Sequence, residues 1–225
     1  QTNSSRSILN ESMRMLISNL KYLTHKPVND DEKCKTFIFT SSIKGEGKTI
    51  ASVNTAINMS NDTNKRVLLI GADLRNPQVH KSFGVDKNRK GLSNIIYEND
   101  IKSYNDYVFK YKNLDILLSG PIPPNPNALL SGEIFAELIS LLKKNYDYII
   151  IDCAPCLLVS DTFSLIQYAY SVVYMFRANF SDMKIIEYIN EHYELGRIKN
   201  LSIVLNAVGE SQAYGYRYGY QYGYQ

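Results

Sequence analysis

Residues Ser41 to Thr49 carry the most specific chemical pattern in the chain. They read Ser-Ser-Ile-Lys-Gly-Glu-Gly-Lys-Thr. Glycines let backbone amides converge on phosphate oxygens, the lysine can reach the β- and γ-phosphates, and the threonine hydroxyl can bind Mg²⁺. Ser42 stands where the usual pattern has its first glycine, and an ordinary glycine-rich turn is the alternative interpretation. The predicted nucleotide ligands are Lys44, Gly45, Glu46, Gly47, Lys48, Thr49 and Ile50.

The sequence on either side supplies the elements that such a loop requires. Thr36 to Thr40 is a short β-branched and aromatic run that predicts a buried strand. Ile50 to Met59 has apolar residues at helical spacing. A strand, a glycine-rich turn and a helix in this order are the context of a phosphate-binding loop, and the helix N-terminus adds a positive dipole end.

Two carboxylates follow predicted strands further along the chain. Asp73 comes just after the apolar run at 66–70, and Asp152 ends the run at 148–152. Open α/β sheets bind ligands beyond the carboxyl ends of their strands, and an aspartate at such an end is typical of a Walker B element. We therefore expect Asp73 and Asp152 to form a Mg²⁺ site with Thr49. Arg75 is a candidate for phosphate or interface contact, and a helix cap or surface ion pair is the alternative for Asp73 and Arg75.

The remaining pattern alternates strands with helices. Residues 78–113 are polar, with a short apolar island at 92–96, and 121–126 form a proline-rich loop. The alternation predicts an α/β fold with a doubly wound, mostly parallel sheet. We divide the chain into an oligomerisation helix (7–22) with its linker over 1–33, a nucleotide-binding domain over 34–212, and a tail over 213–225. For the helix, packing against the core is an equally good alternative to a contact with another subunit. Further strands are predicted at 114–118, 172–176 and 201–206, and further helices at 132–144, 161–170 and 182–195.

The tail is unlike the rest of the chain. Between Tyr214 and Gln225, tyrosines alternate with glycine or polar residues, and no aliphatic residue is present. Such a segment cannot build a core of its own, so we expect it to be disordered in the free protein. Its tyrosines are Tyr214, Tyr216, Tyr218, Tyr220, Tyr222 and Tyr224.

Composition bounds the class of protein. The chain has 225 residues, 44% of them hydrophobic, and a net charge of +3, which gives no argument for a nucleic-acid partner. Three cysteines favour a reducing cytoplasm over a disulfide framework. No apolar run approaches the roughly 20 residues that span a bilayer. Because the chain begins at Gln1, we expect a fragment whose membrane attachment lies in a partner or outside this sequence.

Cys153 and Cys156 have the spacing of a redox dithiol. Asp152 immediately precedes them, and the upstream phosphate loop explains that aspartate better. A metal site would need two further ligands, and the three histidines show no ligand spacing. Redox or metal chemistry at the two cysteines is therefore the weaker interpretation.

The motifs together resemble the bacterial tyrosine kinases of the BY-kinase family, which are the cytoplasmic kinase domains of polysaccharide co-polymerases. The likeness covers nearly the whole chain. Three nucleotide-site elements carry it: the phosphate loop, Ala72 to Arg75, and Asp152. Glu11-Ser12-Met13-Arg14 resembles the family's Glu-x-x-Arg oligomerisation motif. The proline-rich residues 120–126 and the tyrosine cluster at 214–224 resemble two further segments of the family.

The resemblance implies a P-loop NTPase fold with a deviant Walker A loop and binding of Mg-ATP. Lys48 and Asp73 would be catalytic, with Lys48 on the phosphates. Thr49, Asp73 and Asp152 would surround the metal, and Asn206 would contact adenine.

The resemblance also implies partners and a setting. Each tail would be phosphorylated by a neighbouring subunit of a homo-oligomeric ring, with Glu11 and Arg14 at the interface. A transmembrane activator, fused or separate, would hold the chain at the inner face of the cell membrane. A cognate tyrosine phosphatase would reverse the reaction, and the cycle would regulate capsule or exopolysaccharide export.

The chain departs from the family pattern at a few positions. Gly71 replaces the first aspartate of an Asp-x-Asp pair, which is thought to take the tyrosine proton, so we expect a weak kinase. Ile17 replaces the second arginine of the oligomerisation helix. Ile43 occupies the signature-lysine position of the related partitioning ATPases, Lys44 replaces a common proline, and Ala128 replaces a glutamate of the proline-rich loop.

Two other functions fit the same motifs. One is a non-catalytic ATP switch that organises the oligomer, with the tail as a Tyr/Gly/Gln interaction segment. The other is a partitioning-type ATPase that hydrolyses ATP without a protein substrate, against which Ile43 argues.

Overall fold

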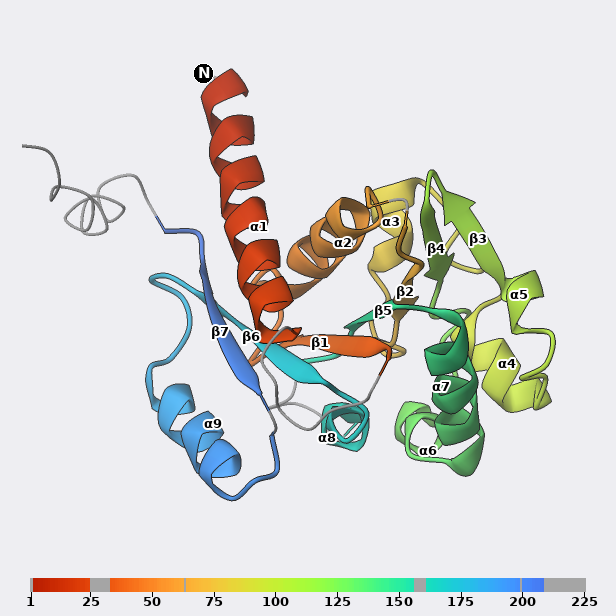
Figure 1. Ribbon diagram of the computed structural model, residues 1–225. Helices are drawn as coiled ribbons and strands as arrows, with labels where there is room; N and C mark the ends of the chain where they lie inside the picture. Colours follow the sequence, from red (N-terminus) through yellow and green to blue (C-terminus); the bar gives the residue numbers. More distant parts are fainter. Residues whose placement is uncertain (1, 25–32, 63, 156–160, 199, 209–225) are drawn as a thin grey trace, which may run out of the picture.

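The computed structural model describes residues 2–24, 33–62, 64–155, 161–198 and 200–208 (Figure 1). Their centre is a seven-stranded sheet of order β3-β4-β2-β5-β1-β6-β7, in which only the β3–β4 pair is antiparallel. The strands are β1 (Lys35–Ser41), β2 (Val67–Gly71), β3 (Val108–Tyr111), β4 (Leu114–Leu117), β5 (Tyr148–Asp152), β6 (Ser171–Arg177) and β7 (Leu201–Asn206).

Helices pack on both faces of this sheet, as a doubly wound fold requires (Figure 1). One face is covered by α1, α2 and α3, and the other by α4 to α8, while α9 packs beside β6. The helices are α1 (Thr2–Thr24), α2 (Lys48–Met59), α3 (Val79–Phe83), α4 (Leu92–Glu98), α5 (Tyr104–Tyr107), α6 (Pro126–Leu130), α7 (Glu133–Asn145), α8 (Asp161–Ile166) and α9 (Lys184–Glu194).

The central strands are buried on both faces, which explains their continuous apolar sequences. In β2, Leu68 and Ile70 join the core under α7, while Val67 and Leu69 join the core under α2. In the register of the sheet, Asp152 at the end of β5 lies beside Phe39 of β1 and Gly71 of β2. The parallel arrangement thus brings the carboxyl ends of three strands together.

The sequence-based expectations of fold class and of the alternating strands are confirmed. Residues 78–113 differ, because this polar segment contains three short helices and the antiparallel strand β3. β3 has only four residues, none of them buried, so its sequence carries little of the apolar pattern that marks a strand. The helix predicted at 161–170 ends at Ile166, and α1 is longer than expected at both ends. The linker at 25–32, Cys156 and the tyrosine tail lie outside the described residues.

α1 belongs to the core of the domain. Leu20 is 1% exposed and Ile17 is 9% exposed, and both pack in the cluster under α2. The Tyr170 hydroxyl donates a hydrogen bond to the Leu23 carbonyl at 2.9 Å, which fixes the end of the helix. Among the described helices, none combines the length and the apolar character needed to cross a membrane.

Replacing Ile17 by arginine should destabilise this domain. A guanidinium at this buried position loses water without gaining a partner, so we expect a loss of about 2–4 kcal/mol in the free energy of unfolding. Met15 on the same helix is 62% exposed, and Met15→Arg should change stability by less than about 0.5 kcal/mol. Denaturant unfolding of the two variants checks this, and equal stabilities would contradict the packing of α1.

Candidate active site

The loop between β1 and α2 has the geometry of a phosphate cradle. Gly45 and Gly47 have φ angles of 96° and 100°, a conformation that favours glycine. A Cβ atom on Gly47 would lie 2.2 Å from Nδ2 of Asn206, so there is also no room for a side chain. The loop ends at the N-terminus of α2, which begins at Lys48.

Side chains from other strands hold this loop in shape. The Asn206 amide donates to the Glu46 carbonyl at 3.1 Å, and the Arg177 guanidinium donates to the Gly45 carbonyl at 3.2 Å. Glu46 is fully buried: its carboxylate accepts hydrogen bonds from the Ile43 amide at 2.9 Å and from the Ser181 hydroxyl. The Glu46 side chain therefore supports the loop from within.

Sequence reasoning missed Arg177 and Ser181. Arg177 directly follows the strand predicted at 172–176 and is the last residue of β6. The carboxyl end of a parallel strand was the signal that could have identified it. Ser181 lies in the connection that follows, where nothing in the local sequence distinguishes it.

Lys48 lies between the two predicted carboxylates. Its ammonium is 3.1 Å from Oδ2 of Asp73 and 3.9 Å from Oδ1 of Asp152. The Thr49 hydroxyl donates to Oδ2 of Asp152 at 2.8 Å. All three charged residues are buried, with exposures of 8% for Lys48, 4% for Asp73 and 0% for Asp152. The structure thus brings together the residues that the sequence placed on three separate elements.

Burial sets the electrostatics of this cluster. Burial raises the pKa of Asp152 to about 6, although Lys48 and the Thr49 hydroxyl oppose the change. For Lys48, burial lowers the pKa, but the carboxylates of Asp152 and Asp73 outweigh it, so the pKa lies above its usual value. Two carboxylates facing one ammonium leave an excess negative charge in a buried place.

These residues fit a divalent cation together with a nucleotide. The buried Oδ1 of Asp152 has no hydrogen-bond partner, which is the state of an oxygen that a metal ion or its water would satisfy. Carboxylate and hydroxyl oxygens are the ligands that Mg²⁺ prefers. The described residues contain no cluster of three or more His, Cys, Asp or Glu side chains suited to a metal. A Mg²⁺ ion here would take its other ligands from water and phosphate.

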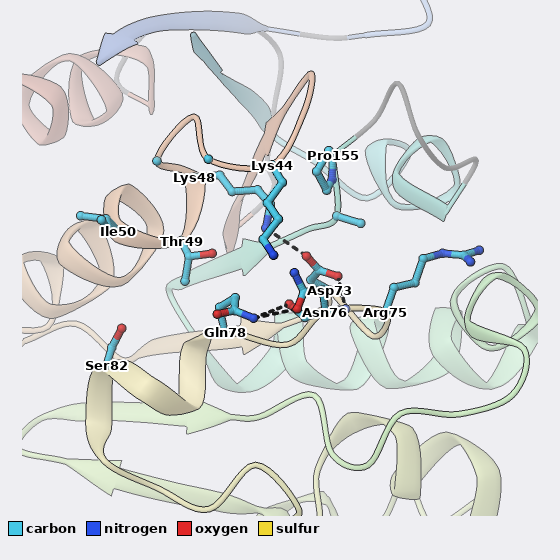
Figure 2. A pocket seen from close by; sticks show the side chains of 13 residues that line it. Lys44, Lys48, Thr49, Ile50, Asp73, Arg75, Asn76, Gln78, Ser82 and Pro155 are labelled. Carbon is cyan, nitrogen blue, oxygen red and sulfur yellow. Dashed lines mark hydrogen bonds and ion pairs between the residues drawn. The ribbon is translucent and has the colours of Figure 1, made fainter. Parts of the chain in front are cut away.

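A cavity of about 480 Å³ opens beside the loop (Figure 2). Lys44, Lys48, Thr49 and Asp73 face one another across it, and Ile50 lies at its side. Asn76 closes the opposite wall, where its backbone N–H donates to Oδ1 of Asp73 at 2.9 Å. The Arg75 side chain extends away from the phosphate loop in this view, although it also lines the cavity.

A second hollow of about 400 Å³ lies on the other side of Gly47 and Ile50. Apolar side chains of α1 and of the end of β7 line most of it, including Leu9, Met13 and Val204. Asn206 borders this hollow, but its own polar atoms are already engaged, since Nδ2 donates to Glu46 and Oδ1 accepts from the Ala207 amide at 2.8 Å. The structure therefore gives Asn206 a role in holding the loop.

Gly71 lies beside this cluster with little space around it. A Cβ atom there would be 2.8 Å from Oγ of Ser119 and 3.3 Å from its backbone nitrogen. The Ser119 hydroxyl donates to the Gly71 carbonyl at 2.8 Å. Ser119 therefore occupies the space into which a side chain at position 71 would extend.

The predicted interface residues lie away from the cluster. Glu11 and Arg14 on α1 form an ion pair of 3.6 Å, with side chains 67% and 76% exposed. Cys153 is fully buried beside Asp152, and its partner in the dithiol interpretation, Cys156, is outside the described residues.

The fold and the site define a P-loop nucleoside-triphosphatase domain. Residues 35–203 match the model of a family described as an AAA domain. The crystal structure of a ParA family ATPase from Chlorobium tepidum has the same fold, with a TM-score of 0.62 and 18% identity over 76% of this chain and 73% of that one.

More similar proteins narrow the class. Tyrosine-protein kinase YwqD of Bacillus subtilis is 31% identical over 213 residues, covering 94% of this chain and 87% of YwqD. CpsD of Streptococcus agalactiae, also a tyrosine-protein kinase, is 34% identical over 80% of this chain and 79% of CpsD. The crystal structure of the VpsO kinase domain superposes on this chain with a TM-score of 0.78 at 32% identity, over 92% of this chain and 98% of the VpsO domain. The chain belongs to the family of bacterial tyrosine-protein kinases, so the enzyme class expected from the sequence is confirmed.

The excess negative charge at Asp152 predicts that removing its charge will stabilise the fold and weaken metal binding. Asp152→Asn should raise the free energy of unfolding by about 1–3 kcal/mol in EDTA near neutral pH, because it removes a buried charge. The pKa of Asp152 is higher in the folded than in the unfolded chain, so the folded protein takes up the proton first as the pH falls. The difference in free energy of unfolding between Asp152→Asn and the native chain should therefore shrink as the pH falls from about 6 to about 4.

Thermal unfolding with and without Mg²⁺ and ATP checks this. The native chain should gain stability from the pair of ligands, and Asp152→Asn should gain much less. A variant that is less stable than the native chain in EDTA would contradict the account of an uncompensated buried charge at Asp152.

Proposed function

We propose that the chain is an ATP-dependent autokinase that phosphorylates the tyrosine tail of a neighbouring subunit. The observation that carries this proposal is the buried cluster of Lys48, Asp73 and Asp152 at the phosphate loop, in a chain whose last twelve residues hold six tyrosines. The cluster supplies the charges that phosphoryl transfer requires, and the tail supplies the acceptor.

Each part of the site has a role in this reaction. The amides around Gly45 and Gly47 would bind phosphate oxygens, and Lys48 would neutralise charge on the β- and γ-phosphates. Thr49, Asp73 and Asp152 would hold Mg²⁺, which when bound neutralises the charge that develops on the transferred group. Asn206 and Glu46 would keep the loop in its binding shape.

The apolar hollow beside Gly47 supports a place for the base of the nucleotide. It adjoins the phosphate cavity through Gly47 and Ile50, and its walls come from α1 and β7. An adenine ring in this hollow would lie against Met13 and Val204, with Asn206 at its border. A base would bind there without requiring Asn206 to release its bonds to the protein.

Removal of the phenol proton from the acceptor tyrosine is the step for which this site is least well equipped. A tyrosine phenol has a pKa of about 10, so it is protonated at neutral pH and transfer benefits from a base. With Gly71 in place of the family's carboxylate, Asp73 would have to serve both the metal and the proton. A slow kinase is the expected result.

Regulation of capsule or exopolysaccharide polymerisation and export is the proposed biological role. A homo-oligomer would present each tail to a neighbour, with the exposed Glu11 and Arg14 of α1 near its interface. A transmembrane activator, fused or separate, would hold the chain at the inner face of the membrane, and a tyrosine phosphatase would reverse the modification.

A non-catalytic ATP switch is the second candidate, and one observation favours it. Ser119 occupies the space beside Gly71, so the chain has neither the usual base nor an open position for one. A partitioning-type ATPase is the third, and the fold alone supports it. Phosphate release without phosphotyrosine would identify the ATPase, and neither product would identify the switch.

Removing the cluster's lysine should abolish transfer. Lys48→Met is expected to lower tail phosphotyrosine at least about 100-fold, because the phosphates lose their buried counter-charge. Lys44 is exposed and lines the same cavity, so Lys44→Met is the matched control and should lose less than about ten-fold. Mass spectrometry of the tail after incubation with ATP and Mg²⁺ measures both. Equal phosphorylation in Lys48→Met and the native chain would overturn the proposal.

Restoring the family's carboxylate should require two changes. Gly71→Asp alone places its Cβ against Ser119, so we expect little gain in rate and some loss of stability. Gly71→Asp with Ser119→Ala removes the hydroxyl in the way, and a base there should raise the rate toward the 10²–10⁴-fold that such assistance typically gives.

Initial rates of tail phosphorylation compare the four chains, with Ser119→Ala alone as the control that should leave the rate unchanged. A folded, ATP-binding double variant no faster than the native chain would show that the missing carboxylate does not limit transfer.

A further inference from the structure

A basic hollow lies at the opposite end of the sheet from the nucleotide site. It has a volume of about 380 Å³ and lies where β2 and β4 begin. Five charged side chains line it: one carboxylate, Asp115, and the four cations Lys65, Arg66, Lys110 and Lys112. The five residues of β2 separate this end from the carboxyl end by about 16 Å.

The carboxylates near the basic hollow are already engaged. Asp147 accepts from the Arg66 amide at 2.9 Å and lies 3.4 Å from the Lys65 ammonium. Asp115 accepts from the Tyr146 hydroxyl at 3.0 Å and lies 3.9 Å from the Lys110 ammonium. Burial and the Asp115 charge raise the pKa of Tyr146, which keeps this phenol a donor.

Two cations in the hollow are not paired with a carboxylate of the described residues. Within the described part of the chain, neither Arg66 nor Lys112 forms an ion pair. The Arg66 guanidinium lies 4.8 Å from the centre of the Tyr146 ring, and the Lys112 ammonium lies 5.7 Å from that of Tyr111. Both side chains are exposed. A guanidinium supported by an aromatic ring and free to bond is a common means of binding phosphate.

We propose that the basic hollow binds phosphotyrosine from the phosphorylated tail of a second copy of this chain. The inference rests on the proposed function, because tail phosphorylation makes the ligand. Six phosphotyrosines carry roughly −9 to −12 charges at neutral pH, and a chain with a net charge of +3 concentrates four cations here. In the proposed oligomer a second copy supplies the tail, and β7, which precedes the tail in its own chain, lies at the far edge of the sheet from β3 and β4.

The basic hollow is separate from the nucleotide site. The nucleotide site is at the carboxyl ends of the strands and the basic hollow is at their other ends, so a phosphorylated tail can leave the active site and remain bound to the oligomer. The two sites share no residue. Mg-ATP and the phosphorylated tail should therefore bind without competing.

The test uses a synthetic peptide of residues 214–225, with and without phosphate on two tyrosines, and the phosphatase-treated full chain. Because the phosphate is introduced by synthesis, the result does not depend on whether the chain is an active kinase. Fluorescence anisotropy should show binding of the phosphopeptide that weakens with salt, and at least about ten-fold weaker binding of the unphosphorylated peptide.

Matched variants locate the site. Arg66→Gln with Lys112→Gln should weaken phosphopeptide binding at least about ten-fold. Lys184→Gln with Arg197→Gln makes the same change of charge at α9 and beyond it, and should leave binding unchanged. Both pairs use exposed side chains, and thermal unfolding confirms that each variant is folded.

Three outcomes would overturn the proposal. They are equal binding of the two peptides, equal losses in the two double variants, and equal binding of a phosphoserine peptide or an oligonucleotide of the same charge. Mg-ATP that displaces the phosphopeptide would likewise contradict a site separate from the nucleotide cavity.

Discussion

The buried contact of Lys48 with Asp73 and Asp152 is the constraint on which the rest of the site depends. Two carboxylates and one ammonium share a place with almost no access to water, and one carboxylate oxygen has no hydrogen-bond partner. Such an arrangement costs stability unless another cation completes it. The charge balance of the site therefore supports the proposal that Mg²⁺ binds here with a nucleotide, and the sheet, the loop and their supports hold these charges in place.

The sheet distributes charge unequally between its two ends. Two buried carboxylates, Asp73 and Asp152, lie where β2 and β5 end, and four cations with one carboxylate line the hollow where β2 and β4 begin. The parallel order of the strands creates this polarity, because everything that follows a strand gathers at one end and everything that precedes it gathers at the other. In the two proposals taken together, one end of the sheet makes phosphotyrosine and the other end binds it.

Much of this site could be predicted because its residues follow strands. Asp73 and Asp152 come just after or at the end of an apolar run, and Thr49 follows the glycine-rich loop that leaves another, so their convergence follows from a parallel sheet. The support from Ser181 could not be predicted, because it depends on how a loop after β6 folds back on Glu46. Nor could the role of Ser119, whose contact with Gly71 joins residues 48 positions apart. The strand β3 escaped prediction since its partner, and not its sequence, makes it a strand.

The central claim is that this cluster transfers phosphate to the tail of another subunit, and a mixing experiment tests it most directly. One chain carries Lys48→Met and an intact tail, and the other has an intact cluster and ends at residue 208. Neither can phosphorylate its own tail. Incubated together with ATP and Mg²⁺, they should produce phosphotyrosine between Tyr214 and Tyr224 of the Lys48→Met chain. Consumption of ATP with no phosphotyrosine on that chain would contradict the account.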